Sequence, residues 1–155
     1  MKKLLFLLVV LTSISCQEKN YTNADLSFKL INAGSLYGAN ELEIQKFEEI
    51  LDSLRRNQNA KKNEIELFNF YAKLKDHNLL TSPYIYLQIE KDSTLRVYLN
   101  EEEYQKVKEY NHADLNERNK KVSLKLDIEK KEEGIYVANH IISVQETDGH
   151  TIVVK

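Results

Sequence analysis

Histidine and carboxylate side chains are the groups in this chain that could perform acid–base chemistry. His112 and Asp114 are separated by one residue, and His140 lies further along in an apolar, alternating stretch. A histidine changes charge near neutral pH, and a neighbouring carboxylate can orient it as a general base. The spacing makes His112, Asp114 and His140 a candidate polar site, but it assigns no catalytic residue. For His140 itself we favour a buried histidine with one hydrogen-bond partner, and a ligand or catalytic base is the alternative.

Motifs of better-defined chemistry are absent from the sequence. The four histidines form no HExxH pair and no other metal-ligand spacing. The chain has no Gly-x-Ser-x-Gly motif, and its four glycines form no phosphate-binding loop. We therefore expect no metal, no cofactor and no enzymatic activity. A small exported hydrolase that uses a histidine is the alternative.

Tyrosine is the unusual feature of the composition, because the chain has nine tyrosines and no tryptophan. Strand-like alternation places Tyr84, Tyr86 and Tyr98 on one face of a predicted hairpin, with Tyr86 opposite Tyr98. Tyrosine offers a large rigid ring with a polar tip, so exposed clusters can bind proteins or sugars. These three residues form a possible binding face. The interpretation that we favour from the pattern is that the two helices pack on this face and the hydroxyls reach its rim.

The N-terminus has the pattern of an exported protein. Lys2 and Lys3 precede an unbroken apolar run over 4–11, and small residues lead from it to Cys16. A run of this length reaches about 12 Å as a helix, which is far less than the ~30 Å hydrocarbon core of a bilayer. The pattern therefore predicts a secretory signal peptide and not a membrane span.

The stretch Leu11-Thr-Ser-Ile-Ser-Cys16 resembles the lipobox of bacterial lipoproteins, in a looser form that looks like that of Bacteroidota. It departs from the family pattern at Ser13, where leucine is preferred. The resemblance implies that a signal peptide, 1–15, is removed and that Cys16 is lipidated on sulfur and acylated on its new amino group, by chains such as palmitate. We then expect a lipidated tether at 16–24 and a single globular domain at 25–155.

Charge and the residues after Cys16 bear on location and partners. Removal of 1–15 leaves 20 basic against 24 acidic residues, a formal charge of −4, which argues against a nucleic-acid partner. The bilayer partner must then be reached through the acyl chains on Cys16. Gln17 is not the aspartate that resembles an inner-membrane retention signal. We expect the outer membrane, facing the periplasm, with surface display as a further possibility.

The longest predicted element is an antiparallel hairpin over 121–144, whose two arms alternate between apolar and polar residues. A three-residue loop that ends at Gly134 would pair Lys131 with Ile135. It would also pair Ile128 with Ala138, Leu126 with His140, Leu124 with Ile142 and Val122 with Val144.

The remaining pattern predicts a helical pair, a second hairpin and a short helix. Helices are expected at 40–56, capped by Asn40, and at 63–78; strands at 84–90 and 94–99; a helix at 101–110; a loop at 111–120; and a last strand at 151–154. A segment over 25–32 is expected to be a short strand or to pack on the domain.

These elements predict an α+β fold, in which the helical hairpin packs on an antiparallel sheet of about five strands. The order after the helices would be β-β-α-β-β-β. The alternative is a barrel like that of oligonucleotide/oligosaccharide-binding proteins, with 25–32 as its first strand and the helical pair as an insertion.

The sequence as a whole predicts a membrane-anchored envelope lipoprotein that acts as a binding or accessory module for a protein or a glycan. Besides the exported hydrolase, an immunity-type lipoprotein that blocks a toxin is an alternative.

Overall fold

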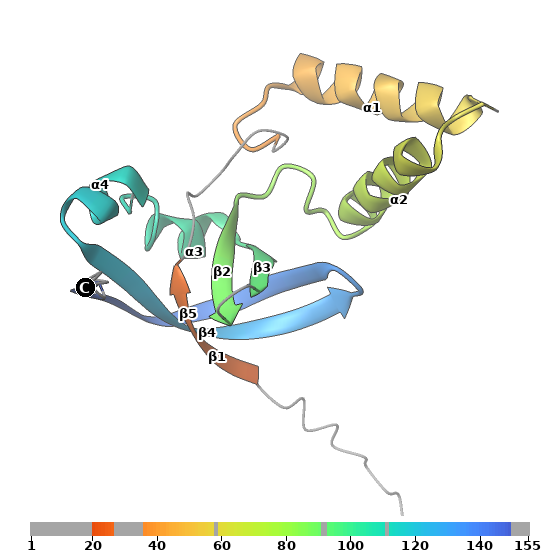
Figure 1. Ribbon diagram of the computed structural model, residues 1–155. Coiled ribbons are helices and arrows are strands. Elements are labelled where there is room, and N and C mark those ends of the chain that lie inside the picture. The colour runs from red at the N-terminus through yellow and green to blue at the C-terminus, as the bar shows by residue number, and fades with distance from the viewer. Residues whose placement is uncertain (1–19, 27–35, 58, 91–92, 111, 150–155) are drawn as a thin grey trace, which may run out of the picture.

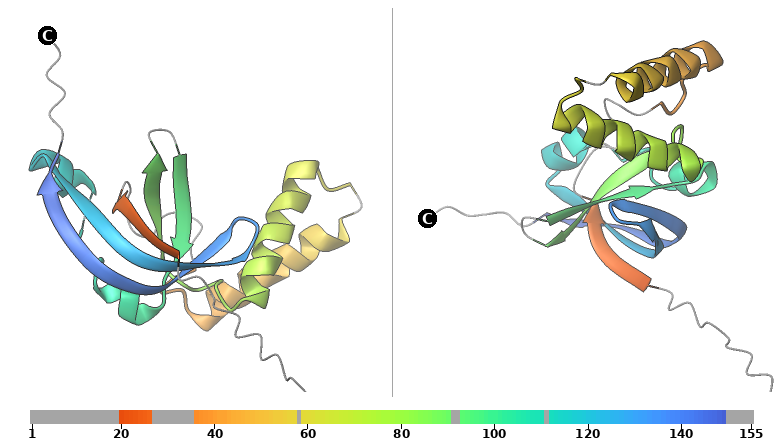
Figure 2. Two further views of the ribbon diagram at one scale, coloured as in Figure 1. Left: turned by 90° about the horizontal axis from the view of Figure 1, so that it is seen from below. Right: turned by 90° about the vertical axis from the view of Figure 1, so that its right-hand side faces the viewer.

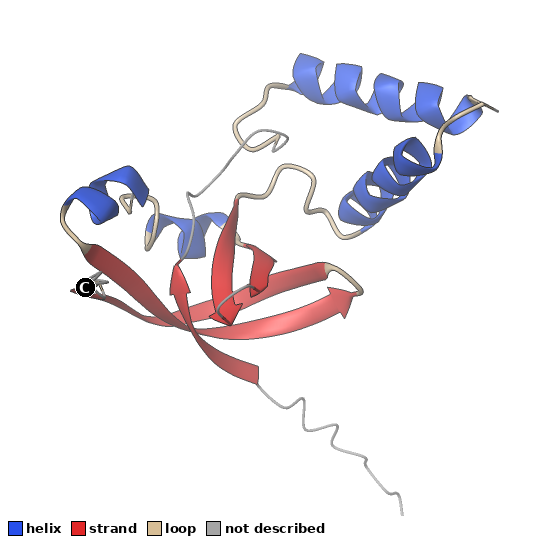
Figure 3. Ribbon diagram, in the orientation of Figure 1, coloured by secondary structure: helices blue, strands red, loops and turns tan. Residues whose placement is uncertain are grey.

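The computed structural model describes residues 20–26, 36–57, 59–90, 93–110 and 112–149, and in this part of the chain the fold is α+β, as predicted. The elements are β1 (Asn20–Leu26), α1 (Glu41–Arg56), α2 (Lys62–Asp76), β2 (Tyr84–Glu90), β3 (Ser93–Tyr98), α3 (Glu101–Gln105), α4 (His112–Glu117), β4 (Lys120–Glu132) and β5 (Ile135–Asp148). Figure 1 shows the two long helices on one side of the strands, and Figure 3 separates the helices from the strands by colour.

The five strands form a closed barrel in the order β1-β2-β3-β5-β4. Each pair of neighbours is antiparallel except β3 and β5, which pair in parallel through Val97–Tyr136 and Tyr98–Val137. Helices α1 and α2 are inserted between β1 and β2, and α3 and α4 lie between β3 and β4 in the chain. This is the barrel-with-insertion arrangement that the sequence analysis gave as its alternative.

Strand β1, the first in the chain, completes the barrel. β1 begins at Asn20, inside the predicted tether, and pairs with β4 along its whole length, from Asn20–Ile128 to Leu26–Val122. It overlaps the predicted 25–32 segment only at its end. The polar sequence of β1 has no apolar alternation, so the pattern gave no sign of a strand there. The expected strand at 151–154 lies outside the described residues.

The long hairpin forms, but most of its predicted register is wrong. Ile128 pairs with Ala138 as expected, whereas Leu126 pairs with Ile141 instead of His140. Leu124 pairs with Val144, Val122 with Glu146, and Glu132 with Ile135. Gly134 has a φ of +81°, which suits the tight turn at this end of the hairpin.

Two bulges in β5 cause the change of register. Asn139 and Ile142 are skipped in the pairing with β4, so each adds one residue to β5 that β4 does not match. Bulges of this kind bend and twist a strand, as a barrel wall requires. They turn Ile141 into the core at 3% exposure and leave Ile142 41% exposed.

The barrel interior is the main core of the protein. It contains Ile85, Leu87, Val97, Leu99, Val107, Leu115, Val122, Leu124, Leu126, Ile128, Ala138 and Ile141. Leu115 enters it from α4, a segment that the sequence analysis predicted to be a loop because nearly all of its residues are polar. A buried leucine and the ion pair between Asp114 and Arg118, one helical turn apart, contribute to holding this short helix.

The helical pair attaches to the barrel through α2. Asn40 and Glu43 form the capping box that begins α1, close to the predicted start. Phe47 of α1 packs edge-on against Tyr71 of α2, with ring centroids 4.8 Å apart. The C-terminal half of α2 then packs on the outer face of the barrel in a second apolar cluster, which comprises Leu74, Leu79, Tyr84, Tyr98 and Ile135.

Candidate functional site

A groove on the outside of the barrel gathers the aromatic and cationic side chains that could bind a ligand. It has a volume of about 460 Å³ and lies between α2, the β2–β3 hairpin and the β4–β5 turn. Its lining residues are Leu67, Phe70, Tyr71, Tyr86, Thr94, Arg96 and Gly134. Small-molecule sites usually measure about 300–1,000 Å³, so the groove suits a small ligand or a short stretch of a polymer.

The pairing of β2 with β3 decides which side chains meet in the groove. Tyr84 lies opposite Tyr98 and Tyr86 lies opposite Arg96, so the predicted register is wrong by two residues. The pairing is irregular between Gln88, which pairs with Thr94, and Glu90, which pairs with Ser93. The sequence pattern did not reveal this irregularity. A shift of two keeps every residue on its face. The three tyrosines therefore still lie together on the outer side of the barrel.

Arg96 is the charged residue of the groove lining. Its Nε and Nη2 donate to the Tyr86 hydroxyl at 3.1 and 2.6 Å. Its guanidinium carbon lies 4.9, 5.2 and 5.4 Å from the ring centroids of Tyr84, Tyr86 and Phe70, within the range of cation–π attraction. Partial burial opposes the charge, but hydrogen bonds to the Tyr98 and Tyr86 hydroxyls outweigh it and raise the pKa of Arg96. The groove thus holds a permanent, oriented positive charge.

Two of the three predicted tyrosines form the covered base of this arrangement. Tyr84 and Tyr98 are 5% and 2% exposed, with ring centroids 5.5 Å apart, beneath the end of α2. Burial raises the pKa of both phenols, so they stay neutral at physiological pH. Tyr86 is only half-buried and lines the groove. A ligand can therefore contact Tyr86, whereas Tyr84 and Tyr98 support Arg96 from below.

An ion-pair network joins the two walls of the groove. Lys73 Nζ lies 2.7 Å from one carboxylate oxygen of Glu132, and His77 Nε2 lies 3.2 Å from the other. The hydrogen bond from Lys73, with a smaller contribution from His77, lowers the pKa of Glu132. The carboxylate therefore connects the C-terminal half of α2 to the end of β4, and Figure 2 shows the β4–β5 turn beside this helix.

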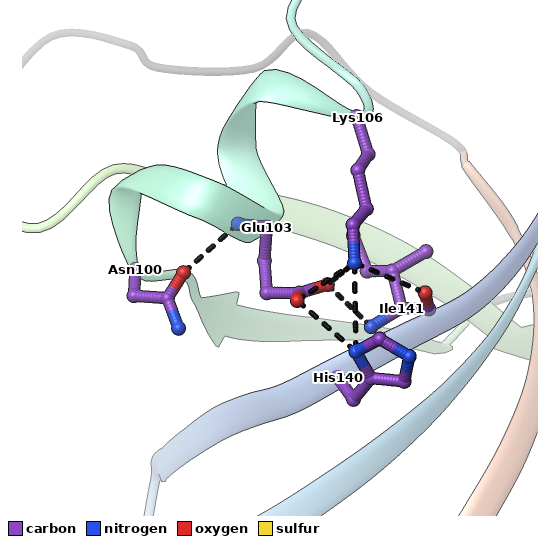
Figure 4. Close-up of polar contacts among 5 residues, drawn as sticks. All are labelled: Asn100, Glu103, Lys106, His140 and Ile141. Carbon is purple, nitrogen blue, oxygen red and sulfur yellow. Dashed lines mark hydrogen bonds and ion pairs between the residues drawn. The ribbon is translucent and has the colours of Figure 1, made fainter.

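A second polar cluster lies where α3 meets β5 (Figure 4). Glu103 is 2% exposed, and its carboxylate accepts hydrogen bonds from Lys106 Nζ at 2.8 Å and from the Ile141 N–H at 2.5 Å. His140 Nδ1 lies 3.1 Å from the same carboxylate, and Asn100 caps the helix through the Glu103 N–H. Burial opposes the charge, but these donors outweigh it and lower the pKa of Glu103. The cluster docks α3 onto β5.

The structure changes the expected environment of His140. The predicted place on the apolar face is wrong, because the bulges turn this side chain outward, where it is 59% exposed. Its acidic neighbour is Glu103, whose carboxylate is shared with Lys106 and the Ile141 N–H. A carboxylate engaged in this way anchors the backbone, which is a structural use of the charge.

The other predicted polar residues have different neighbours. Asp114 accepts a hydrogen bond from Arg118 Nη2 at 2.8 Å, and Arg118 Nη1 also contacts Glu146 at 3.0 Å. The side chain of His112 lies outside the described part of the chain. The described contacts therefore do not join Asp114 to His140.

Metal and membrane features can be stated for the described residues only. Within them, no group of three or more histidine, cysteine, aspartate or glutamate side chains could hold a metal ion. Over the same residues, every helix is too short or too polar to cross a bilayer. The signal peptide, 1–15, and the lipidation site, Cys16, lie outside the described residues.

Sequence reasoning missed the part played by Arg96. Alternation along β3 places Arg96 on the same face as Tyr98, and this signal was available. The partner Tyr86 could not be identified without the irregularity in β2. The contribution of Phe70 depends on how α2 crosses the barrel, which no local pattern encodes.

Comparison of the chain with models of known protein families, with curated protein sequences and with solved structures finds no match. What the chain binds must therefore be inferred from its own residues.

Proposed function

We propose that this chain is a membrane-anchored envelope lipoprotein that acts as a non-enzymatic binding module, and that its ligand is a glycan held in the groove between α2 and the β2–β3 hairpin. The observation that carries the proposal is the lining of this groove. Aromatic rings of Phe70, Tyr71 and Tyr86 line it, and those of Phe70 and Tyr86 lie against the oriented guanidinium of Arg96. Flat rings beside a fixed donor group are the features that recognise the apolar faces and hydroxyls of a sugar.

The position of the groove supports this assignment by analogy of architecture. In barrels of this type, ligands bind on the face of the second and third strands, between the connection after the first strand and the turn after the fourth. Here Tyr86 and Arg96 come from β2 and β3, Phe70 from the helical insertion, and Gly134 from the β4–β5 turn. Because one architecture can carry many functions, the side chains and not the fold decide the ligand class.

A glycan fits the site better than a protein partner. An extended peptide commonly binds by adding a strand to a sheet edge, whereas the residues that line this groove present aromatic rings and one guanidinium to a ligand. A stable protein interface buries about 800 Å² on each partner. The groove is an open depression of about 460 Å³, a volume within the range of small-ligand sites.

Nucleic acid is disfavoured by charge. Surfaces that bind single strands combine aromatic stacking with a basic groove that follows the phosphates. Arg96 is the one basic residue among the residues that line this groove. The formal charge of the chain without residues 1–15 is −4, and this negative charge also disfavours nucleic acid.

The cellular part of the proposal depends on the lipobox resemblance. Acyl chains on Cys16 would hold the barrel at a membrane, and we propose the periplasmic face of the outer membrane. The alternative is the inner membrane or the cell surface. Such a module would meet the glycans of the envelope without needing a soluble partner.

A glycan-binding measurement on matched tyrosine variants tests the proposal. The full chain in detergent would be applied to a panel of envelope-type oligosaccharides, together with Tyr86→Ala and Tyr37→Ala. Loss of a contact ring should weaken binding about tenfold or more in Tyr86→Ala. Tyr37→Ala removes a tyrosine that contacts Glu101, outside the groove, and should bind as the unmodified chain does. Equal binding by both variants, or no binding by the unmodified chain, would contradict the proposal.

A further inference from the structure

The charge of Arg96 has no acidic partner within the described part of the chain. Its contacts there are the Tyr86 and Tyr98 hydroxyls and the rings of Phe70, Tyr84 and Tyr86. The other basic side chains around the groove differ in this respect, since Lys73 is paired with Glu132. A partly desolvated guanidinium held by neutral groups only is an unusual arrangement, because charges removed from water are normally paired.

The geometry leaves the guanidinium able to receive an anion. A guanidinium carries five N–H donors. The Tyr86 hydroxyl accepts from Nε and Nη2, and the Tyr98 hydroxyl accepts a further bond, so donors remain for a ligand in the groove. The ring contacts restrict the orientation of the guanidinium plane, and an arginine fixed in this way can donate charge-assisted hydrogen bonds to a carboxylate through its remaining N–H groups.

We infer that the groove selects an acidic sugar, with the carboxylate of a uronic-acid unit on Arg96 and the sugar ring against Phe70 and Tyr86. The inference rests on the proposed function, since it names the class of glycan that the same groove binds. Thr94, which also lines the groove, would offer its hydroxyl to the same unit. A neutral sugar would leave the guanidinium without its counter-ion and would bind more weakly.

The test compares each acidic disaccharide with its own neutral counterpart. The full chain in detergent is titrated with a set of uronic-acid disaccharides and with the same compounds after reduction of the carboxyl group to an alcohol. The acidic member of a pair should bind about tenfold more tightly or better, as expected for charge-assisted hydrogen bonds. Arg96→Gln should bind both members equally, at the affinity of the neutral one. Arg118→Gln removes a positive charge outside the groove and should keep the preference.

The outcomes separate this inference from the proposed function. If acidic and neutral sugars bind the unmodified chain equally, the acidic selectivity is wrong and the glycan-binding module stands. If neither member of any pair binds, both are wrong. Arg96 packs against α2, so the Arg96→Gln variant requires a check of its folding. If that variant does not fold, a salt titration of the unmodified chain tests whether charge causes the preference for acidic sugars. Rising NaCl should reduce the preference for the acidic member and leave the neutral affinity unchanged; a preference that does not fall at all with salt would overturn the role of Arg96.

Discussion

At the scale of single residues, Glu103 shows what a buried charge does in this protein. The carboxylate is 2% exposed and receives donors from its own helix and from β5. The Ile141 N–H that it accepts belongs to the bulged part of β5, where the ladder of strand hydrogen bonds is irregular. Glu103 therefore replaces a missing strand contact and fixes α3 at the same point.

Substitution of Glu103 should destabilise the fold. Glu103→Gln keeps the shape but places an amide among groups that donate, so we expect unfolding free energy to fall by about 2 kcal/mol. Glu102→Gln changes an exposed neighbour on the same helix and should alter stability by less than about 0.5 kcal/mol. Urea denaturation measures both. Equal stability of the two variants would show that Glu103 does not hold α3 in place.

The same carboxylate predicts a pH dependence. Because the pKa of Glu103 in the folded protein is below its ordinary value of 4.5, the unfolded chain takes up the proton first as pH falls. The stabilisation is therefore complete above about pH 4.5 and is lost as pH falls through the lower folded value. Between pH 6 and the acid limit, the stability gap between the unmodified chain and Glu103→Gln should narrow. A constant gap would contradict the role given to the charge.

Residue identities alone predicted only part of the candidate site. Alternation correctly placed Tyr84, Tyr86 and Tyr98 on one face, because the period of a strand does not depend on its partner. The meeting of Tyr86 with Arg96 depends on a two-residue shift, and exposure depends on where α2 lies. The predicted position of His140 was wrong because Asn139 forms a bulge in β5, and a single bulge reverses the face of the residue that follows it.

At the scale of elements, α2 and the β4–β5 hairpin form one unit through Glu132. Lys73 and His77 lie one helical turn apart on α2 and reach the two oxygens of this carboxylate. Loss of the link should loosen the end of α2 without unfolding the barrel, because the barrel has its own core.

Hydrogen exchange on a matched pair of glutamate variants tests this link. Glu132→Gln should increase amide exchange in the C-terminal half of α2 and leave β4 protected. Glu133→Gln, which changes the next and more exposed residue, should leave exchange in α2 unchanged. Unchanged protection of α2 in Glu132→Gln would show that apolar packing through Leu74 is sufficient to hold the helix.

Elements with a strong period were predictable and elements without one were not. Helix α1 was placed within a residue of its observed bounds because Asn40, the acidic first turn and the basic last turn act locally. β1 and α4 carry few apolar residues and are held by backbone pairing or by a single leucine. The sequence pattern therefore predicted a tether over most of β1 and a loop over α4, because tertiary contacts that stabilise an element leave no local periodicity.

At the scale of the whole molecule, the site and the proposed anchor lie towards the same end of β4. β1 begins at Asn20, which pairs with Ile128, and β4 then continues to Glu132 beside the groove. Three residues lie between Cys16 and Asn20, so their Cα atoms are at most about 14 Å apart. Lipidation at Cys16 would therefore keep this end of the barrel, and with it the groove, close to the bilayer surface.

Fatty-acid labelling tests the anchor. Cells that express the chain would be grown with an alkyne-bearing fatty acid, and the chain should become labelled. Cys16→Ala should lose the label, because the acceptor sulfur and the cleavage position are both removed. Ser15→Ala, which changes the preceding small residue, should retain it. An unlabelled unmodified chain, or label that persists in Cys16→Ala, would rule out lipidation at this cysteine.

The most direct test of the glycan-binding groove is to locate a bound sugar on the protein. Isotope-labelled full chain in detergent would be titrated with a uronic-acid disaccharide, and the chemical shifts of its amide and aromatic groups would be followed. We predict saturable shift changes that are largest at Phe70, Tyr86 and Arg96, and small changes around Glu103 and His140. No saturable change, or changes centred on the Glu103 cluster, would contradict the groove as the binding site.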